Sequence, residues 1–303
     1  MKRKKLVIML SLIGIFILII ARKSALTNAT EAVDQCIHIV IPSLFPFFYL
    51  STLLCGNIET INLLLPKPLR NALRIDNKDT GLLILSFLGG YPVGAQAVAT
   101  AWKHGQIESQ KAKRLLGFCN NAGPSFIFGI LGALFSKPAA APVLWIVHIS
   151  SALLTGWLLP YDKGTERVEQ SAHYDSRDVT LTNALGSSLR ITATVCGWVI
   201  LFRILIGIFL LKLKNIIPIE ITIILSGLLE LTNGCLGLTA ITNEALRFIT
   251  CSAMLSFGGL CVALQTRSVV NGLNMKYYFP GKILQTIISI ILSAILSIFL
   301  FSS

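Results

Sequence analysis

Charged residues are scarce in this chain of 303 residues, at 13% of the sequence, and only 14 residues are Asp or Glu. Hydrophobic residues make up 54%, and the mean hydropathy is +0.74. A chain of this composition has too little polar surface to face water on most of its sides, which excludes an ordinary soluble protein. The sequence therefore predicts an all-α, multi-pass membrane protein surrounded by a lipid bilayer.

Motifs for metal, redox and cofactor chemistry are also missing. The four histidines are scattered, no H-E-x-x-H occurs, and none of the seven cysteines forms a C-x-x-C pair. The glycines of residues 89–94 follow no predicted strand and have no acidic residue at the distance that a dinucleotide site needs. No paired nucleophile and base is evident. We expect no metal, no cofactor and no enzymatic activity.

The net charge of +12 does not indicate a nucleic-acid partner. Lys and Arg fall almost wholly at the edges of apolar segments, where lipid headgroups and the positive-inside rule account for them. The four basic residues at 2–5 favour a cytoplasmic N-terminus, and the apolar run that follows is predicted to be an uncleaved span rather than a signal peptide.

Apolar segments of membrane-spanning length recur along the chain. A polar stretch at 161–180 divides them, which predicts an N-terminal span and flank (1–30), a first membrane repeat (31–160), a linker and a second repeat with a C-terminal span (181–303). The two halves repeat a similar order of segments, as in transporters with inverted repeats. The apolar segments are 6–21, 33–57, 80–101, 115–135, 139–159, 191–211, 216–240, 245–266 and 280–301.

Two of these segments are interrupted by turn residues, Gly-Gly-Tyr-Pro-Val-Gly at 89–94 and Asn-Asn-Ala-Gly-Pro at 120–124. Non-helical backbone at membrane depth persists only where protein buries it or where it lines a cavity. Pro92 and Pro124 suit the first turn of a half-helix. A helix N-terminus attracts carboxylates and phosphates, and Asn120, Asn121 and Ser125 would add hydrogen bonds beside it. These breaks predict a binding site for a small anion.

Two charges lie deep in apolar sequence, Arg203 and Glu230. An ionisable group at the centre of a bilayer costs about 2.5 to 3.5 kcal/mol, so it usually has a partner or a function. We expect Arg203 either to bind an anionic substrate or to pair with Glu230. Glu230 and Asn233, at the break of the second half, are candidates for a coupling cation or proton. Snorkelling of Arg203 to the interface is the alternative.

Three motifs together resemble a known family. They are Gly-Gly-Tyr-Pro-Val-Gly-Ala at 89–95, Arg-Leu-Leu-Gly-Phe-Cys-Asn-Asn-Ala-Gly-Pro at 114–124, and Ser-Phe-Gly-Gly-Leu-Cys-Val at 256–262 with Gln265. The chain is similar, over about residues 30–275, to the sporulation integral membrane proteins of the YlbJ or stage V sporulation protein V family. That family belongs with the nucleoside-recognition, or gate-domain, membrane proteins.

The resemblance implies a carrier with inverted repeats and re-entrant hairpins that moves dipicolinic acid across the outer forespore membrane of endospore-forming bacteria. Gln96 departs from the family pattern, in which a basic residue often follows the Gly-Ala pair. Carried over by motif, the site residues are Gly89, Gly90, Tyr91, Pro92, Gly94, Asn120, Asn121, Gly123, Pro124, Phe257, Gly258, Gly259 and Gln265.

Other functions stay open from the sequence. A cation-coupled nucleoside carrier would use the same broken helices but would need hydrogen bonds to a ribose more than an arginine. A non-transporting membrane scaffold for spore assembly would have no use for a buried Arg203 or Glu230. The sequence also allows a homo-oligomer.

Overall fold

The computed structural model describes residues 2–56, 65–161, 180–210, 216–270 and 272–301. Over these ranges the chain is helical and contains no strand, so the predicted all-α class is confirmed. The predicted linker at 161–180 lies almost wholly outside the described residues. The main helices are α1 (Lys2–Ile20), α2 (Arg22–Gln35), α3 (Ile41–Gly56), α4 (Lys67–Leu73), α5 (Thr80–Leu88), α6 (Val93–Lys103), α7 (Ser109–Leu115), α8 (Pro124–Gly129), α9 (Ala140–Leu158), α10 (Leu181–Leu205), α11 (Ile219–Leu229), α12 (Leu231–Gly237), α13 (Glu244–Phe257), α14 (Gly259–Val270) and α15 (Tyr278–Phe301).

Five helical stretches in the described residues are long and apolar enough to cross a membrane. They are Arg22–Leu54, Ala140–Leu158, Leu181–Leu210, Glu244–Val270 and Tyr278–Phe301. The apolar segments at 80–101, 115–135 and 216–240 do not form single spanning helices, because each is divided into shorter helices. The chain is therefore a multi-pass membrane protein with interrupted helices between its long spans.

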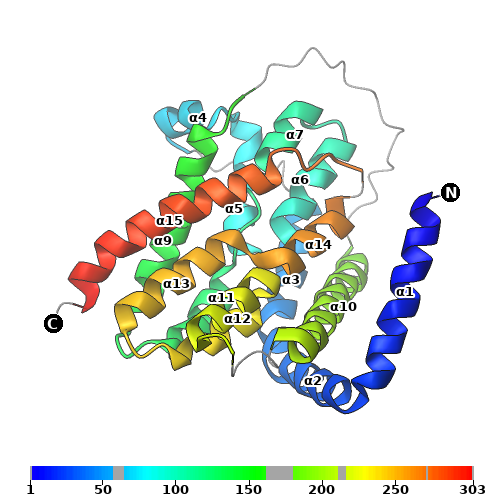
Figure 1. Cartoon of the computed structure of the whole chain (residues 1–303). Coiled ribbons are helices and arrows are strands. Elements are labelled where there is room, and N and C mark those ends of the chain that lie inside the picture. Colours follow the sequence, from blue (N-terminus) through cyan, green and yellow to red (C-terminus); the bar gives the residue numbers. More distant parts are fainter. Residues whose placement is uncertain (1, 57–64, 162–179, 211–215, 271, 302–303) are drawn as a thin grey trace.

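The long helices surround the short, interrupted ones. In Figure 1, α15 crosses α9 and runs alongside α13, and it packs against both, while α10 packs against α2 and α3. Helix α1 stands at the outer edge of the molecule, and most of its large apolar side chains are exposed. The α5–α6 pair packs against α14, which brings the first part of the chain against the last.

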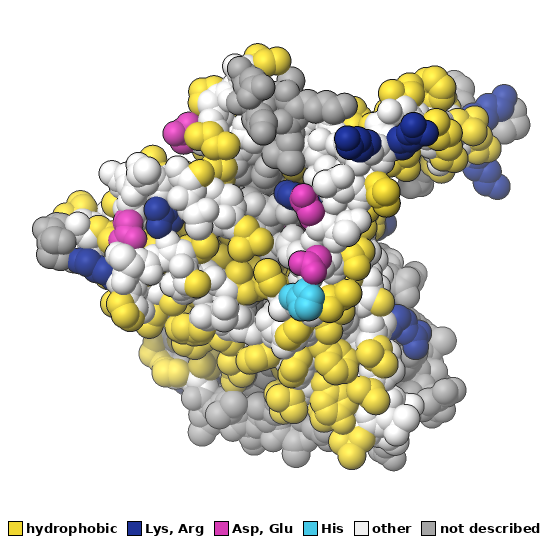
Figure 2. Space-filling view, turned by 90° about the horizontal axis from the view of Figure 1, so that it is seen from below, with side chains coloured by type: hydrophobic (Ala, Val, Ile, Leu, Met, Phe, Trp, Pro, Cys, Tyr) yellow, Lys and Arg dark blue, Asp and Glu magenta, His cyan; other side chains and the backbone are white. Residues whose placement is uncertain are grey.

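The polarity of α15 is opposite to that of a helix in a water-soluble protein. Its buried positions include Lys282, Gln285, Ser289 and Ser293, whereas its isoleucines are exposed. Figure 2 shows one face of the molecule on which hydrophobic side chains form a broad area and charged side chains are few and separate. An apolar exterior with a polar seam inside is the arrangement that lipid favours.

Glycines allow backbones to approach closely at the helix crossings. A methyl group at Gly94 would overlap the carbonyl oxygen of Cys119, and one at Gly281 would overlap the carbonyl of Gly117. These glycines bring α6 and α15 against the segment between α7 and α8. The positions of the interrupted segments therefore depend on the absence of side chains at the crossings.

One end of the bundle is held by buried basic residues on α7. Lys111 forms ion pairs with Asp76, at 2.7 Å, and with Asp79, which is 1% exposed. The fully buried Arg114 donates to the carbonyl oxygens of Leu73, at 2.7 Å, and of Gly156. These carbonyls lie in the last turns of α4 and α9, where a cation also interacts favourably with the helix dipoles.

The close approach at Gly94 gives the first prediction. Gly94→Ala should lower the free energy of unfolding by about 1 to 3 kcal/mol, because the new methyl group has no space beside Cys119. The matched control is Gly197→Ala in α10, where nothing lies within 4 Å of the added carbon and helix propensity should raise stability slightly. The measurement is the thermal unfolding midpoint in detergent. Equal unfolding midpoints for the two variants would contradict a close approach of the backbone at Gly94 to that at Cys119.

The Lys111 cluster gives a prediction about pH. Burial lowers the pKa of Lys111, but hydrogen bonds to Asp76 and Asp79 outweigh it and raise that pKa above its ordinary value of 10.5. A raised pKa contributes stability that is fully present below pH 10.5 and is lost as the pH rises through the folded-state value. Lys111→Met, which leaves Asp79 buried without its partner, should cost about 3 kcal/mol at pH 7.

The difference in unfolding midpoint between Lys111→Met and the native protein should shrink as the pH rises through the folded-state pKa of Lys111. Lys67→Met, at an exposed position on α4, is the control and should change the midpoint little at any pH. A difference that stays constant up to pH 12 would contradict an electrostatic role for Lys111.

Candidate functional site

Each half of the chain contains interrupted helices. The first break separates α5 from α6 at residues 89–92, and an extended stretch at 120–123 precedes α8, which begins at Pro124 as the sequence predicts. In the second half, α11 ends and α12 begins on either side of Glu230, and Gly258 separates α13 from α14. Gly90 and Gly258 have φ values of 73° and 80°, which glycine adopts without strain.

The two breaks of the first half lie backbone to backbone. A methyl group on Gly90 would stand 3.2 Å from the nitrogen of Gly123, and one on Gly123 would stand 3.0 Å from the Cα of Gly90. Both positions therefore require glycine, because even an alanine would separate the two segments.

Tyr91 joins the first half to the second. Its hydroxyl donates to the carbonyl oxygen of Leu255 at 2.8 Å, and its ring lies against Gly258, where an added methyl group would meet it at 3.4 Å. Gly259 in turn faces the backbone of Gly227 on α11. The breaks at 89–92, 120–123, 230 and 258 thus gather in one region.

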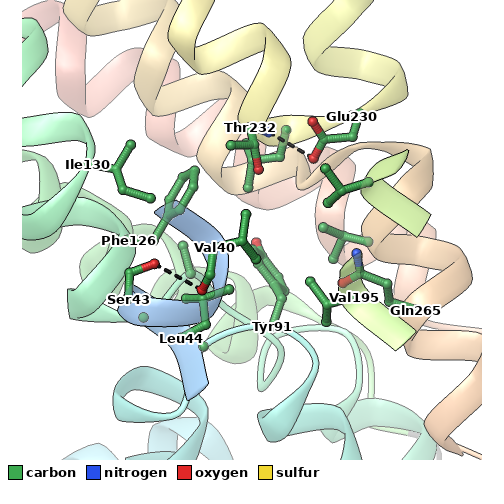
Figure 3. Close-up of a pocket in the computed structure, with 16 residues that line it drawn as sticks. Val40, Ser43, Leu44, Tyr91, Phe126, Ile130, Val195, Glu230, Thr232 and Gln265 are labelled. Carbon is green, nitrogen blue, oxygen red and sulfur yellow. Dashed lines mark hydrogen bonds between the residues drawn. The ribbon is translucent and has the colours of Figure 1, made fainter. Parts of the chain in front are cut away.

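A pocket lies beside these breaks. Its cavity volume is about 50 Å³, within an empty space of about 520 Å³ that is partly open to the outside. In Figure 3, Phe126 and Ile130 line one side, Glu230 and Gln265 line the other, and Tyr91 lies between them. The remaining lining residues are Val40, Ser43, Leu44, Gly90, Ala122, Gly123, Val195, Val199, Leu231, Thr232 and Val262.

The structure brings part of the predicted site to this pocket. Of the residues that the sequence predicts for the site, Gly90, Tyr91, Gly123, Glu230 and Gln265 line the pocket. The other predicted residues do not line the cavity. Their contacts are packing or hydrogen-bonding contacts with neighbouring segments. These are Gly89, Gly94, Asn120, Asn121, Ser125, Arg203, Asn233, Gly258 and Gly259.

Among the described residues that line the pocket, Glu230 is the one charged side chain, and it is 2% exposed. Its carboxylate accepts hydrogen bonds from the backbone nitrogens of Thr232, at 3.0 Å, and Asn233, at 2.7 Å, and from the Asn233 side chain. These are the first amides of α12, so Glu230 itself occupies the anion-binding N-terminus of that helix. Figure 3 shows the bond to Thr232 beside the cavity.

Arg203 does not pair directly with Glu230, which corrects that part of the expectation. Its guanidinium donates to the carboxylate of Glu31 on α2 at 2.6 Å, and more weakly to the Asn233 side chain at 3.4 Å. The backbone amides of α12 already donate hydrogen bonds to Glu230. Arg203 forms its ion pair with Glu31 on α2 instead. Arg203 reaches Glu230 only through Asn233.

The two asparagines of the first-half motif hold the backbone break in place. Both are fully buried. Asn120 donates to the hydroxyl of Thr266 on α14 at 2.8 Å, and Asn121 donates to the carbonyl of Phe118 at 2.7 Å. Asn121 therefore satisfies a backbone carbonyl beside the break, whereas Asn120 connects the break to α14.

Sequence reasoning missed three buried polar residues beside the breaks. His148 on α9 accepts from the backbone nitrogen of Ala122 at 3.1 Å. Lys282 on α15 donates to the carbonyl of Asn120 at 2.5 Å, and Gln285 donates to the Asn121 side chain at 3.0 Å. A signal for the α15 residues was available, because polar residues recur every three or four positions at 282, 285, 289, 293 and 297 within apolar sequence.

The chemistry of the pocket suits reversible binding. Its wall is mainly apolar, and the polar groups come from the ends of interrupted helices. Within the described ranges, no three His, Cys, Asp or Glu side chains gather closely enough to hold a metal ion. The pocket would accept a small molecule with an apolar face and a few hydrogen-bonding groups.

The cap at Glu230 gives a stability prediction. Glu230→Ala should lower the free energy of unfolding by about 1 to 2 kcal/mol, because the first amides of α12 lose their acceptor. Glu230→Gln, which keeps one acceptor oxygen, should lose less. The control is Glu220→Ala in the exposed first turn of α11, where the loss should stay below about 1 kcal/mol. Thermal unfolding in detergent measures the stability of all three variants. Equal losses of stability in Glu230→Ala and Glu220→Ala would contradict a capping role for Glu230.

Comparisons with known proteins give one relative. Over 292 residues the chain is 27% identical to the sporulation integral membrane protein YlbJ of Bacillus subtilis (strain 168), with 82% of this chain and 71% of that protein covered. No protein-family model and no solved structure matches the chain. The resemblance predicted from the motifs is thus supported across most of the chain. This multi-pass integral membrane protein is a distant homologue of a sporulation integral membrane protein.

Proposed function

We propose that the chain is a membrane carrier of a small anionic solute, which binds in the pocket between the interrupted helices and undergoes no covalent change there. The observation that supports this most is that residues from three helix breaks, Gly90, Gly123 and Glu230, line one pocket. Carriers place substrate where discontinuous helices meet near the middle of the membrane, and irregular backbone is tolerated there only where protein buries it or where it lines a cavity.

We further propose that the two halves are inverted repeats that move against each other. The order of elements supports this. In the first half, a pair broken near the pocket, α5 and α6, is followed by α7, the break before α8, and the span α9. In the second half, the broken pair α11 and α12 is followed by α13, the break before α14, and the span α15. Alternating access would then open the pocket to each side in turn.

Dipicolinate is the substrate we propose, with transport across the outer forespore membrane during sporulation. The homology to a sporulation integral membrane protein and the resemblance of the motifs support this setting. The pocket lining supports a flat aromatic substrate, because Tyr91 and Phe126 provide flat apolar surfaces and the Gln265 side chain provides hydrogen-bonding groups. A pyridine ring with carboxylates has this combination of an apolar face and polar edges.

Coupling to a cation or proton follows from Glu230. An ionised carboxylate in the wall would repel an anionic substrate, and the low local dielectric would strengthen that repulsion. A proton or cation bound at Glu230 would remove it. The Asn233 side chain, which donates to Glu230 and accepts from Arg203, would become a second oxygen ligand only by turning its amide over. We therefore propose that coupling occurs at Glu230.

A cation-coupled nucleoside carrier is the second candidate, and specific observations favour it. Ser43, Thr232 and Gln265 offer neutral hydrogen-bonding groups in the pocket, and the one charged lining residue is an acid. A ribose and an uncharged base would need no compensating cation from the protein.

Uptake into proteoliposomes tests the proposal and separates the two candidates. We expect saturable uptake of labelled dipicolinate that an excess of inosine does not inhibit. Gln265→Leu and Thr232→Val should each lower uptake about tenfold, which corresponds to one lost hydrogen bond in the pocket. Thr250→Val is the matched control, since its hydroxyl bonds only within α13, to Leu246.

Inosine uptake without dipicolinate uptake would establish the nucleoside carrier, and no uptake of either would contradict both. Arg203→Leu belongs in the same series, because a contact between Arg203 and substrate stays a prediction. Intact uptake by that variant would limit Arg203 to its ion pair with Glu31.

A further inference from the structure

Lys282 is a fully buried lysine beside the pocket. It lies in the second turn of α15, a helix long and apolar enough to cross the membrane, and its side chain is 0% exposed. Holding an ammonium group in such a place costs several kcal/mol unless an opposite charge compensates it. The residue therefore needs an explanation.

Neutral groups alone satisfy its hydrogen bonds. The ammonium donates to the carbonyl of Asn120 at 2.5 Å, to Oε1 of Gln285 at 3.0 Å and to the hydroxyl of Tyr91 at 3.4 Å. It also lies 5.1 Å from the centre of the Tyr91 ring. No ion pair between Lys282 and an acid occurs among the described residues. The hydrogen bonds are complete but the charge is not neutralised.

Two of these neighbours connect Lys282 to the pocket. Tyr91 contacts the ammonium and also lines the cavity. Asn120 lies two residues before Ala122, which lines the cavity as well. Lys282 itself does not line the cavity, so a substrate group would reach its ammonium only by displacing the Tyr91 hydroxyl.

We infer that Lys282 is the counter-charge for a carboxylate of the substrate, which replaces the Tyr91 hydroxyl as the third acceptor of the ammonium. This rests on the proposed function and names the residue that makes the pocket select an anion. It also resolves the difficulty that the pocket lining contains an acid and no base. A carboxylate acceptor would add an attraction between opposite charges that the ammonium's bond to the Tyr91 hydroxyl lacks.

The test compares two probes of similar shape, dipicolinate, whose carboxylates are charged, and the neutral pyridine-2,6-dicarboxamide. Binding of each to the full-length protein in detergent is measured by calorimetry. The native protein should prefer dipicolinate by about tenfold to a hundredfold. Lys282→Gln keeps amide donors for the Asn120 carbonyl but removes the charge, and it should abolish the preference. Lys282→Arg, which keeps the charge, should retain most of it.

A second variant tests the same charge without removing the lysine. Gln285→Glu places a carboxylate at the side chain that lies 3.0 Å from the ammonium and should pair with it permanently. This variant should also lose the preference for dipicolinate, although its thermal unfolding midpoint should not fall below that of Lys282→Gln. It keeps the inference testable where Lys282→Gln does not fold.

The outcomes separate the two proposals. Loss of the preference in Gln285→Glu, and in Lys282→Gln where it folds, supports the counter-charge. Equal weakening of both probes, or an unchanged preference, would show that Lys282 only positions the Asn120 segment and would overturn the inference while leaving an anion carrier in place. No binding of dipicolinate by the native protein would overturn the proposed function and this inference with it.

Discussion

The contact between the backbones of Gly90 and Gly123 holds together the region on which the proposed binding site depends. Two unwound segments can lie side by side inside an apolar bundle only if their peptide groups find partners and no side chain separates them. The side chains of Asn121, His148 and Lys282 supply such partners. The pocket is the space that remains where helices cannot continue.

The polarity of the bundle follows from the same constraint. Lipid offers no hydrogen bonds, so polar side chains turn inward, and the seam along α15 places Lys282 and Gln285 against the broken segments. Neutral partners complete the hydrogen bonds of Lys282, whereas Glu230 receives backbone amides and the Asn233 side chain. Two unlike charges thus flank one cavity without pairing with each other, an arrangement that leaves both free to respond to a ligand.

Local sequence features predicted several of these elements. Proline and glycine have strong backbone preferences, so the start of α8 at Pro124 and the interruptions at 89–92 and Gly258 were readable from the residues alone. The position of Glu230 at a break was predictable for the same reason. The partner of Arg203 was not, because Glu31 lies 172 residues away along the chain. Lys282 was missed because its periodic polar neighbours indicate a buried face but not what that face contacts.

The sequence by itself determined the membrane environment, the helical class and the points where helices stop, because these depend on composition and on the conformational limits of single residues. The tertiary structure alone decided which breaks meet, which candidates line the pocket and which buried charges find partners. Those properties depend on contacts between segments far apart in the chain, such as the bond from Tyr91 to Leu255, and no local pattern encodes them.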